Sequence, residues 1–379
     1  MRNHSSTLLL VGLIASATIG AAQQTKPSTN APTRRADRPP PILSPEILPD
    51  GGVTFRLQAP KANEVKVSGQ FGPETVMTKD DHGLWSATVA AVPSGVHEYR
   101  FVVDGLNVID PQNSAVKPQR WPGVSILHVP ASPPAPWDLQ EIPHGTLHEH
   151  TYKSKALDKW RRIIVYTPPA AASAGRLPVL YLAHGYSDNE GTWTVHGKAH
   201  WIMDTLIASK KAVPMMVVMM DAHALPPGAT GFDEYGPANS AAHCRELAED
   251  IIPLVERGYK VAAKPRSRAF AGLSMGGHHA LTVAMNHHDK FGWIGAFSSA
   301  PPPTNSIAAG LNDAQGVNRD LRLFWIGCGK KDFLFQRNEE FIALLKEKGI
   351  RHEYVETEGD HSWPVWRRYL TDFAPKLFR

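Results

Sequence analysis

Between about residues 42 and 130, apolar and polar residues alternate in short runs that Gly and Pro separate. This spacing is typical of an all-β sandwich, in which each strand buries one face. The runs are VTFRLQAP, EVKVSGQF, GLWSATVAAV, HEYRFVVDGLNVID and SILHVP. We therefore predict a small immunoglobulin-like β-sandwich over residues 42–130, followed by a Pro-rich linker over residues 131–145.

The pattern changes over residues 146–379, where wholly apolar runs alternate with runs of helical periodicity. Strand-like runs, several of them without a polar face, are RRIIVYTP, PVLYLAHG, MMVVMMDA, RAFAGLS, WIGAFSSA and LRLFWIGCG. Strands of this kind are covered on both faces of a sheet. Helical periodicity occurs in HWIMDTLIASKK, ELAEDIIPLVERGY, NEEFIALLKEKG and PVWRRYLTDFAPKLF. The alternation predicts a doubly wound, mainly parallel α/β sheet.

The first 41 residues follow neither pattern. Arg2 lies in a short polar start, an apolar run begins at Leu8, and small residues end the run at Ala22. This is the pattern of a signal peptide over residues 1–22, and it predicts a secreted or periplasmic protein. Residues 23–41 are rich in Pro, Thr, Arg and Ala, and we expect a flexible leader there.

Composition and charge exclude several classes of function for this chain. The chain has 379 residues, 42% of them hydrophobic, which is enough for two domains with a large core. Its formal net charge is +4 with scattered Lys and Arg, so we expect no nucleic-acid partner. No segment after the signal peptide is apolar enough to span a membrane. No Cys/His cluster has metal-ligand spacing, and whether Cys244 and Cys328 pair stays open, as does the oligomeric state.

The segment AFAGLSMGGHHAL carries the strongest chemical signal. Ser274 stands between Gly272 and Gly276, after a strand-like run and before a run of helical periodicity. A sharp strand-to-helix turn exposes such a serine and leaves no room for side chains on its neighbours. We therefore interpret Ser274 as a nucleophile at the elbow of an α/β-hydrolase fold.

A serine nucleophile needs a histidine base and an acid that orients the histidine. In the α/β-hydrolase arrangement these follow the serine in the order acid, then histidine, at strand exits. Asp332 follows the predicted strand LRLFWIGCG, and His361 follows the predicted strand HEYVETEG. Three positions in the required order predict a Ser274–Asp332–His361 triad.

Ester hydrolysis through a serine also requires N–H groups that stabilise the negative oxygen of the tetrahedral intermediate. Met275, directly after the nucleophile, supplies one backbone N–H by position. The second should come from the loop after an earlier strand, and in YLAHGYSDNEGTW we assign it to Tyr186. We expect His184 in the same loop to be structural.

At these residues the chain resembles carbohydrate esterase family one, the feruloyl and acetylxylan esterases related to enterochelin esterase and esterase D. The resemblance covers about residues 145–379 and rests on RRIIVYTPP, PVLYLAHGYSDNEGTW, PMMVVMMDAH, GLSMGG, IGCGKKDFL and GDHSWPVWRRYL. It implies the same nucleophile, acid and base at Ser274, Asp332 and His361. The motifs VTFRLQAPKANEVKVSGQF, GLWSATV and YRFVVDGLNVIDPQN resemble family forty-eight carbohydrate-binding modules.

The resemblance implies an ester on an acylated plant polysaccharide as substrate, without a metal or organic cofactor. A feruloyl ester on arabinoxylan is the first expectation, and acetylated xylan is the second. A siderophore ester, acyl transfer to a sugar, and a noncatalytic glycan-binding protein are further alternatives. Trp193 and Trp363 lie beside motif loops, so either is a candidate for packing on an acyl group or sugar, or for the core.

Overall fold

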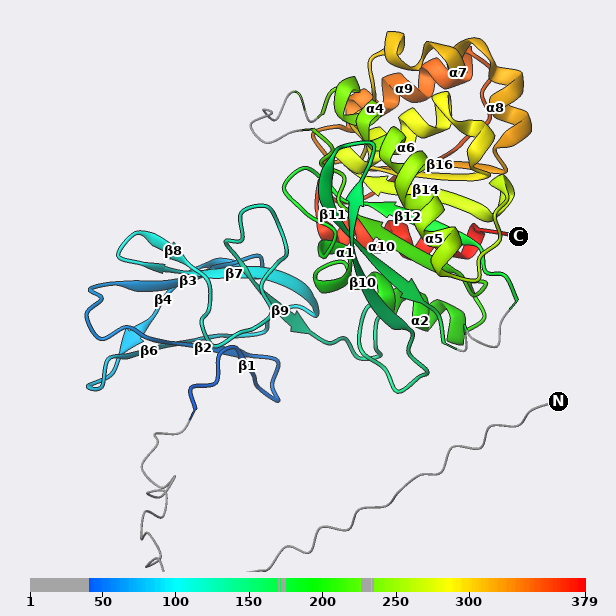
Figure 1. Cartoon of the computed structure of the whole chain (residues 1–379). Helices are drawn as coiled ribbons and strands as arrows, with labels where there is room; N and C mark the ends of the chain where they lie inside the picture. Colours follow the sequence, from blue (N-terminus) through cyan, green and yellow to red (C-terminus); the bar gives the residue numbers. More distant parts are fainter. Residues whose placement is uncertain (1–40, 170, 172–174, 226–232, 234) are drawn as a thin grey trace, which may run out of the picture. The chain divides into compact units, whose positions relative to one another are not determined.

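The computed structural model describes residues 41–379, apart from residues 170, 172–174, 226–232 and 234. Ile42–Arg379 form one compact unit. The predicted signal peptide (1–22) and all but the last residue of the predicted leader (23–41) lie outside the described residues. Figure 1 shows two kinds of architecture along the described chain, strands alone and then strands alternating with helices.

The N-terminal part is an all-β sandwich, as the alternating pattern predicts. One sheet has the order β1 (Glu46–Ile47), β2 (Val53–Gln58), β6 (Leu84–Val89), β5 (Thr78–Lys79). The other has the order β4 (Gly72–Val76), β3 (Val65–Gly69), β7 (Gly95–Val103), β8 (Leu106–Val108), and β9 (Ser125–Val129) also pairs with β7. Alternate residues of β2 and β3, namely Val53, Phe55, Val65 and Val67, are fully buried between the sheets.

The C-terminal part is built on one eight-stranded sheet. Its order is β10 (Thr146–Ser154), β11 (Lys159–Thr167), β13 (Met216–Met220), β12 (Val179–Ala183), β14 (Arg268–Leu273), β15 (Trp293–Phe297), β16 (Leu323–Gly329), β17 (Glu353–Thr357). The strands from β13 to β17 pair in parallel, whereas β10 and β11 are antiparallel. The predicted α/β-hydrolase fold class is therefore confirmed.

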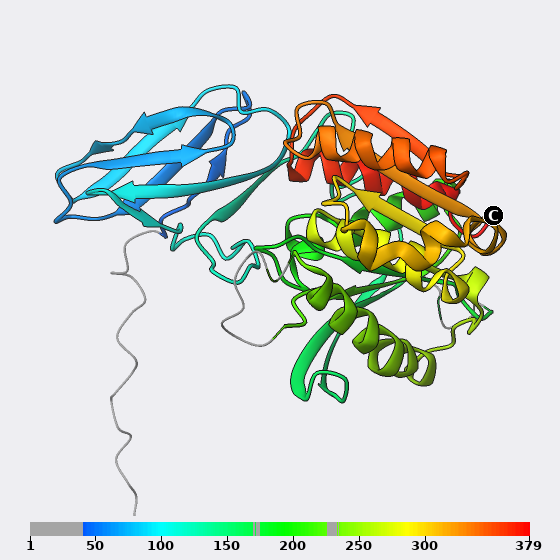
Figure 2. The same cartoon turned by 90° about the horizontal axis from the view of Figure 1, so that it is seen from above.

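The absence of a polar face in the central strands has a direct cause. In β12, Val179, Tyr181 and Ala183 belong to one hydrophobic core, and Leu180 and Leu182 belong to another. Successive side chains point to opposite faces, so a strand covered on both faces must be apolar throughout. Figure 2 shows helices on both faces of the sheet.

Each face has its own set of helices. The first core contains residues of α4 (Pro237–Glu246), α5 (Ile252–Gly258), α6 (Met275–Asn286), α7 (Ala308–Asn312), α8 (Ala314–Asp320) and α9 (Phe335–Glu347). The second contains residues of α1 (Thr192–Val195), α2 (Ala199–Ala208) and α10 (Trp363–Phe373). Parallel strands end at the same edge of a sheet. The loops after β12, β14, β16 and β17 therefore lie along one edge of this sheet.

Two local features differ from the sequence expectation. The predicted helix ELAEDIIPLVERGY is divided by a π-helical turn over Leu247–Ile251, between α4 and α5. Pro253 lacks the N–H that a regular helix would need there, so the turn widens before it. Strand β10 was not expected because most of its residues are exposed and polar.

A buried cation connects β11 to the ends of β13 and α4. Arg161 donates from Nε to Glu246 Oε1 (2.8 Å) and from Nη1 to Asp221 Oδ2 (2.7 Å) and the carbonyl of His223 (2.8 Å). Glu246 is fully buried and also accepts from the hydroxyl of Tyr152 (2.7 Å). A buried carboxylate that loses its cation is strongly destabilising.

Among the described residues, no helix combines the length and hydropathy that a membrane span requires.

We expect Arg161→Met to lower the free energy of unfolding by about 3 kcal/mol, because it leaves Glu246 buried without a cation. Chemical denaturation followed by circular dichroism measures this change. Arg319→Met is the matched control, since Arg319 forms an exposed pair with Asp320 and should cost less than ~1 kcal/mol. Equal losses in both variants would contradict the importance of the buried network.

Candidate active site

Ser274 lies at a sharp turn between β14 and α6. Its backbone has φ 53° and ψ −110°, a conformation that residues other than glycine rarely adopt. The turn is close-packed, because a Cβ on Gly272 would lie 2.4 Å from the carbonyl oxygen of Gly276. A Cβ on Gly276 would lie 2.6 Å from the carbonyl oxygen of His184. Both glycines are thus required by sterics, as the elbow interpretation expects.

Asp332 and His361 lie on the loops after β16 and β17, and their side chains meet. His361 Nδ1 lies 2.8 Å from Asp332 Oδ2 and 3.0 Å from Oδ1. The N–H of Leu334 donates to Asp332 Oδ1 (2.8 Å) and fixes the carboxylate. Burial would raise the pKa of Asp332, but its hydrogen bond and attraction to His361 outweigh burial and lower that pKa. An ionised Asp332 accepts the Nδ1 proton, which leaves Nε2 as the acceptor.

Two aromatic rings lie beside the imidazole of His361. The ring of Phe333 lies 4.5 Å from the His361 ring between centroids, and the ring of Trp366 lies 5.0 Å away in an edge arrangement. Phe333 is 74% exposed although it is a large apolar side chain. Its position directly after Asp332 was the only sequence signal for it.

The loop after β12 passes directly beside the serine. A Cβ on Gly185 would lie 2.7 Å from Leu273 Cδ1 and 3.5 Å from Ser274 Cβ. The loop turns at once, since the N–H of Asp188 donates to the carbonyl of Gly185 (3.2 Å). Tyr186, the predicted second oxyanion donor, is therefore part of a tight turn next to Ser274. Met275, the predicted first donor, is the first residue of α6.

His184 contacts the backbone of this loop from the protein interior. It is fully buried, its Nδ1 lies 2.7 Å from the carbonyl oxygen of Gly185, and the N–H of Ala222 donates to its Nε2 (2.9 Å). These two contacts leave neither ring nitrogen of His184 without a partner. The geometry agrees with the structural role expected for His184.

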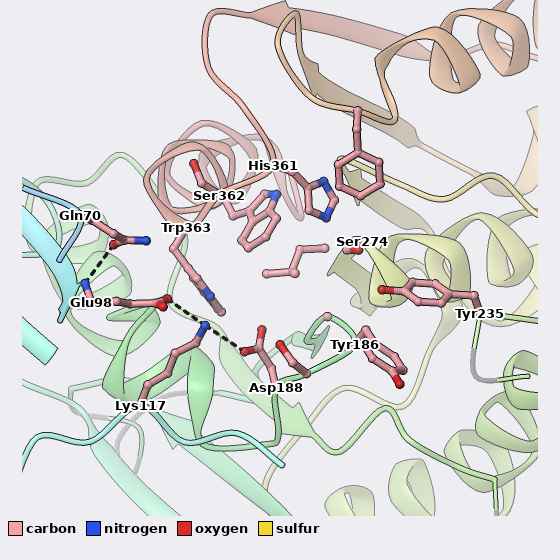
Figure 3. Close-up of a pocket in the computed structure, with 15 residues that line it drawn as sticks. Gln70, Glu98, Lys117, Tyr186, Asp188, Tyr235, Ser274, His361, Ser362 and Trp363 are labelled. Carbon is pink, nitrogen blue, oxygen red and sulfur yellow. Dashed lines mark hydrogen bonds and ion pairs between the residues drawn. The ribbon is translucent and has the colours of Figure 1, made fainter. Parts of the chain in front are cut away.

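These loops enclose a cavity of about 350 Å³. Ser274 and His361 both line it, and Figure 3 draws both side chains among the residues of its lining. Its other lining residues are Gln70, Glu98, Lys117, Gly185, Tyr186, Ser187, Asp188, Tyr235, Leu273, Phe333, Ser362, Trp363 and Trp366. Part of the lining is aromatic. Another part, which we call the charged wall, consists of Glu98, Lys117 and Asp188.

The two tryptophans named as substrate-binding candidates have different surroundings. Trp363 lines the cavity, although only 3% of it is exposed. Trp193 is 1% exposed, donates from Nε1 to the carbonyl of Ala183 (3.0 Å) and packs edge-on against Trp363 at 4.9 Å between centroids. It is not among the cavity's lining residues, so it supports Trp363 from the core.

Glu98 and Lys117 of the charged wall come from the β-sandwich, Asp188 comes from the loop after β12, and no sequence pattern predicted this group. Lys117 Nζ lies 2.8 Å from Glu98 Oε1 and 3.5 Å from Asp188 Oδ1 (Figure 3). Lys117 and Asp188 are buried, with 9% and 4% of their side chains exposed. A single lysine between Val116 and Pro118 gives no pattern that would distinguish it from a surface residue.

Within the described residues, His184, Asp221 and His223 form the one group of three His, Cys, Asp or Glu residues whose ligand atoms all lie within 4.8 Å of one another. Both ring nitrogens of His184 already take part in hydrogen bonds, and Arg161 supplies a cation to Asp221. A metal ion would have to displace these contacts, so the group does not fit a metal site. Cys244 and Cys328 are both buried and free, which answers the question of their pairing.

Comparison with known proteins places the chain in a family. Residues 154–377, more than half of the chain, match the family described as "Putative esterase". Residues 43–118 match carbohydrate-binding module 48, the isoamylase N-terminal domain. The module match ends at Pro118, inside the segment that carries Lys117.

Two curated relatives illustrate the range of the family. An endo-1,4-beta-xylanase/feruloyl esterase of Xylanibacter ruminicola is 31% identical over 349 residues, which cover 88% of this chain and 46% of that protein. The chain thus spans about half the length of this relative. An acetyl esterase of Caldicellulosiruptor saccharolyticus is 25% identical over 229 residues, covering 52% of this chain and 81% of the relative.

Solved structures show the same fold. A ferulic acid esterase has a TM-score of 0.53 and 26% identity, covering 62% of this chain and 98% of that one. The enterobactin esterase of Shigella flexneri has a TM-score of 0.60 and 18% identity over 86% of this chain and 92% of its own. The latter likeness concerns the fold alone, and it extends over the N-terminal part as well.

The family match over residues 154–377 and the module match before it agree with the fold and the elbow already described. The chain therefore belongs to this esterase family and carries an N-terminal family-48 carbohydrate-binding module.

Proposed function

We propose that this esterase is a serine carboxylic-ester hydrolase that releases ferulate from arabinoxylan, with Ser274, Asp332 and His361 as its triad. One observation carries the proposal. Ser274, with its strained backbone, lines the same cavity as His361, whose ring is hydrogen bonded to Asp332. These are the positions that a nucleophile and its base require.

The reaction proceeds by two acyl transfers. Ser274 Oγ attacks the carbonyl carbon of the ester while His361 Nε2 takes the hydroxyl proton. The carbonyl oxygen becomes negative and accepts from the N–H groups of Met275 and Tyr186. The intermediate then expels the alcohol, which receives the proton from His361. Water repeats the sequence on the acyl-enzyme and releases the carboxylic acid.

Asp332 has an orienting and electrostatic role in this scheme. Its carboxylate holds the Nδ1 proton of His361, so that Nε2 faces the cavity as a base. When His361 becomes an imidazolium, the buried carboxylate stabilises the new charge at 2.8 Å. The lowered pKa of Asp332 keeps the carboxylate ionised at neutral pH.

The lining of the cavity favours an aromatic acyl group. Tyr186, Tyr235, Phe333, Trp363 and Trp366 line it. Aromatic rings in a concave pocket provide large contact areas for a planar ring. The name of the Xylanibacter ruminicola relative supports a feruloyl ester. Acetylated xylan is the second candidate, supported by the acetyl esterase relative.

We also propose that the enzyme is exported to the periplasm or the exterior. The support is the signal-peptide pattern of residues 1–22. A polymeric glycan substrate, which the N-terminal module favours, would be met there.

We expect Ser274→Ala to lower kcat for methyl ferulate by at least ~10³-fold, because the nucleophile is lost. Release of ferulate from the purified protein measures the effect. Ser209→Ala, at the exposed end of α2, should keep full turnover, and both variants should unfold at the wild-type temperature. Turnover that survives in Ser274→Ala would assign the chemistry to another residue.

We expect Phe333→Ala to reduce kcat/KM for methyl ferulate by about 10-fold, because an exposed ring beside His361 is available to a bulky acyl group. The variant should change kcat/KM for 4-nitrophenyl acetate by less than ~3-fold, since acetate buries little apolar surface. Phe333→Leu is the control that retains apolar contact with His361. If the wild-type enzyme cleaves 4-nitrophenyl acetate but not methyl ferulate, acetylated xylan becomes the favoured substrate.

A further inference from the structure

A segment of the carbohydrate-binding module runs along the predicted oxyanion loop. The N–H of Arg120 donates to the carbonyl of Ser187 (2.9 Å), and Gln119 pairs with Asp188 in an antiparallel bridge. The hydroxyl of Thr192 donates to the carbonyl of Pro118. The loop after β12 thus shares backbone hydrogen bonds with a part of the chain outside the esterase family match.

A buried ion pair strengthens this contact. Lys117 Nζ lies 3.5 Å from Asp188 Oδ1 and 2.8 Å from Glu98 Oε1. Burial raises the pKa of Asp188, and the charge of Lys117 opposes this effect. A carboxylate with 4% of its side chain exposed needs a cation, because burial has removed the water that would stabilise its charge. Lys117 supplies that cation from the module.

The position of Asp188 matters for catalysis because of the turn that it closes. Its N–H donates to the carbonyl of Gly185, so Tyr186 lies inside a four-residue turn. One side of this turn packs on Ser274 through Gly185, and the other side meets the segment Lys117–Arg120. The guanidinium of Arg120 also lies 5.9 Å from the centre of the Tyr186 ring. The turn has little freedom while both contacts are present.

We propose that Lys117 is a positioning residue of the oxyanion hole, which acts through Asp188 to hold the backbone N–H of Tyr186 next to Ser274. This inference rests on the proposed serine-esterase function. It makes the module part of the catalytic machinery, in addition to any carbohydrate that it binds. An oxyanion donor is effective only when it is held in place before reaction, and a shift of about 1 Å can reduce the rate 10²-fold.

The lining of the cavity offers a different role for Lys117, which is direct contact with the substrate. The two roles differ in the kinetic constant that they affect. A donor held in place acts on the transition state of every ester, including one too small to reach Lys117. A direct contact acts on the binding of large substrates and leaves small esters unaffected.

The test is the turnover of 4-nitrophenyl acetate by Lys117→Met. We expect kcat to fall by about 10- to 100-fold with KM changed by less than ~2-fold, because transition-state stabilisation is lost. An aryl boronic acid, which forms a tetrahedral adduct with a serine, should bind more weakly by a similar factor. Reduced stability alone would leave its affinity for the folded protein unchanged.

Further variants make the test specific. Lys66→Met removes a partly exposed lysine of the same module, which pairs with Glu64 instead of a residue of the cavity, and should keep wild-type kcat. Lys117→Arg retains the cation and should restore most of kcat. The double variant Lys117→Met/Asp188→Asn removes both buried charges and should be more active than Lys117→Met. If Lys117→Met does not fold, a loss of kcat in Asp188→Asn supplies the same test.

Wild-type kcat and boronate affinity in Lys117→Met would overturn the proposal, most clearly if KM for a feruloylated oligosaccharide rises. Lys117 would then contact the substrate. Failure of the proposed function is a separate outcome, because it appears as absent Ser274-dependent turnover in the wild-type protein itself.

Discussion

The backbone conformation of Ser274 is the constraint on which the surrounding structure depends. A φ of 53° with ψ of −110° costs free energy, of the order of 1–3 kcal/mol, and persists only where neighbouring contacts prevent relaxation. Here β14 precedes the serine, α6 follows it, and the backbone at Gly272 meets that at Gly276. The strain points the hydroxyl out of the sheet, which no regular strand or helix position could do. The two hydrophobic cores on the faces of the sheet hold this turn in place.

Buried charge is the second organising feature of the site. Water would ordinarily stabilise Glu246, Asp188 and Asp332, and each instead has a partner that is cationic or becomes cationic in the reaction. Arg161 pairs with Glu246, Lys117 with Asp188, and His361 with Asp332. The first two carboxylates have permanent cations and suit structural roles. Asp332 has a partner that gains its charge only on taking a proton, and this property suits catalysis.

The sequence predicted the parts of the fold that follow from local chemistry. Apolar runs without a polar face identified β12, β13 and β14, and the glycines around Ser274 identified the elbow. Strand β10 escaped detection because its exposed polar residues give no hydrophobic signal. Lys117 escaped because its partners, Glu98 and Asp188, are distant in sequence and come together only in the folded chain. Pairing of this kind is a property of the tertiary structure, and no periodicity records it.

The loop after β12, which carries the proposed oxyanion donor Tyr186, has contacts on two sides. His184 hydrogen bonds to the carbonyl of Gly185 from the side of Asp221 and Arg161, within the esterase domain. On its other side the loop meets the module, through the backbone of Arg120 and the cation of Lys117. The loop is therefore in contact with both parts of the chain. On the proposed function, the module contributes to catalysis as well as to binding, because it supports the side of the loop that His184 does not contact.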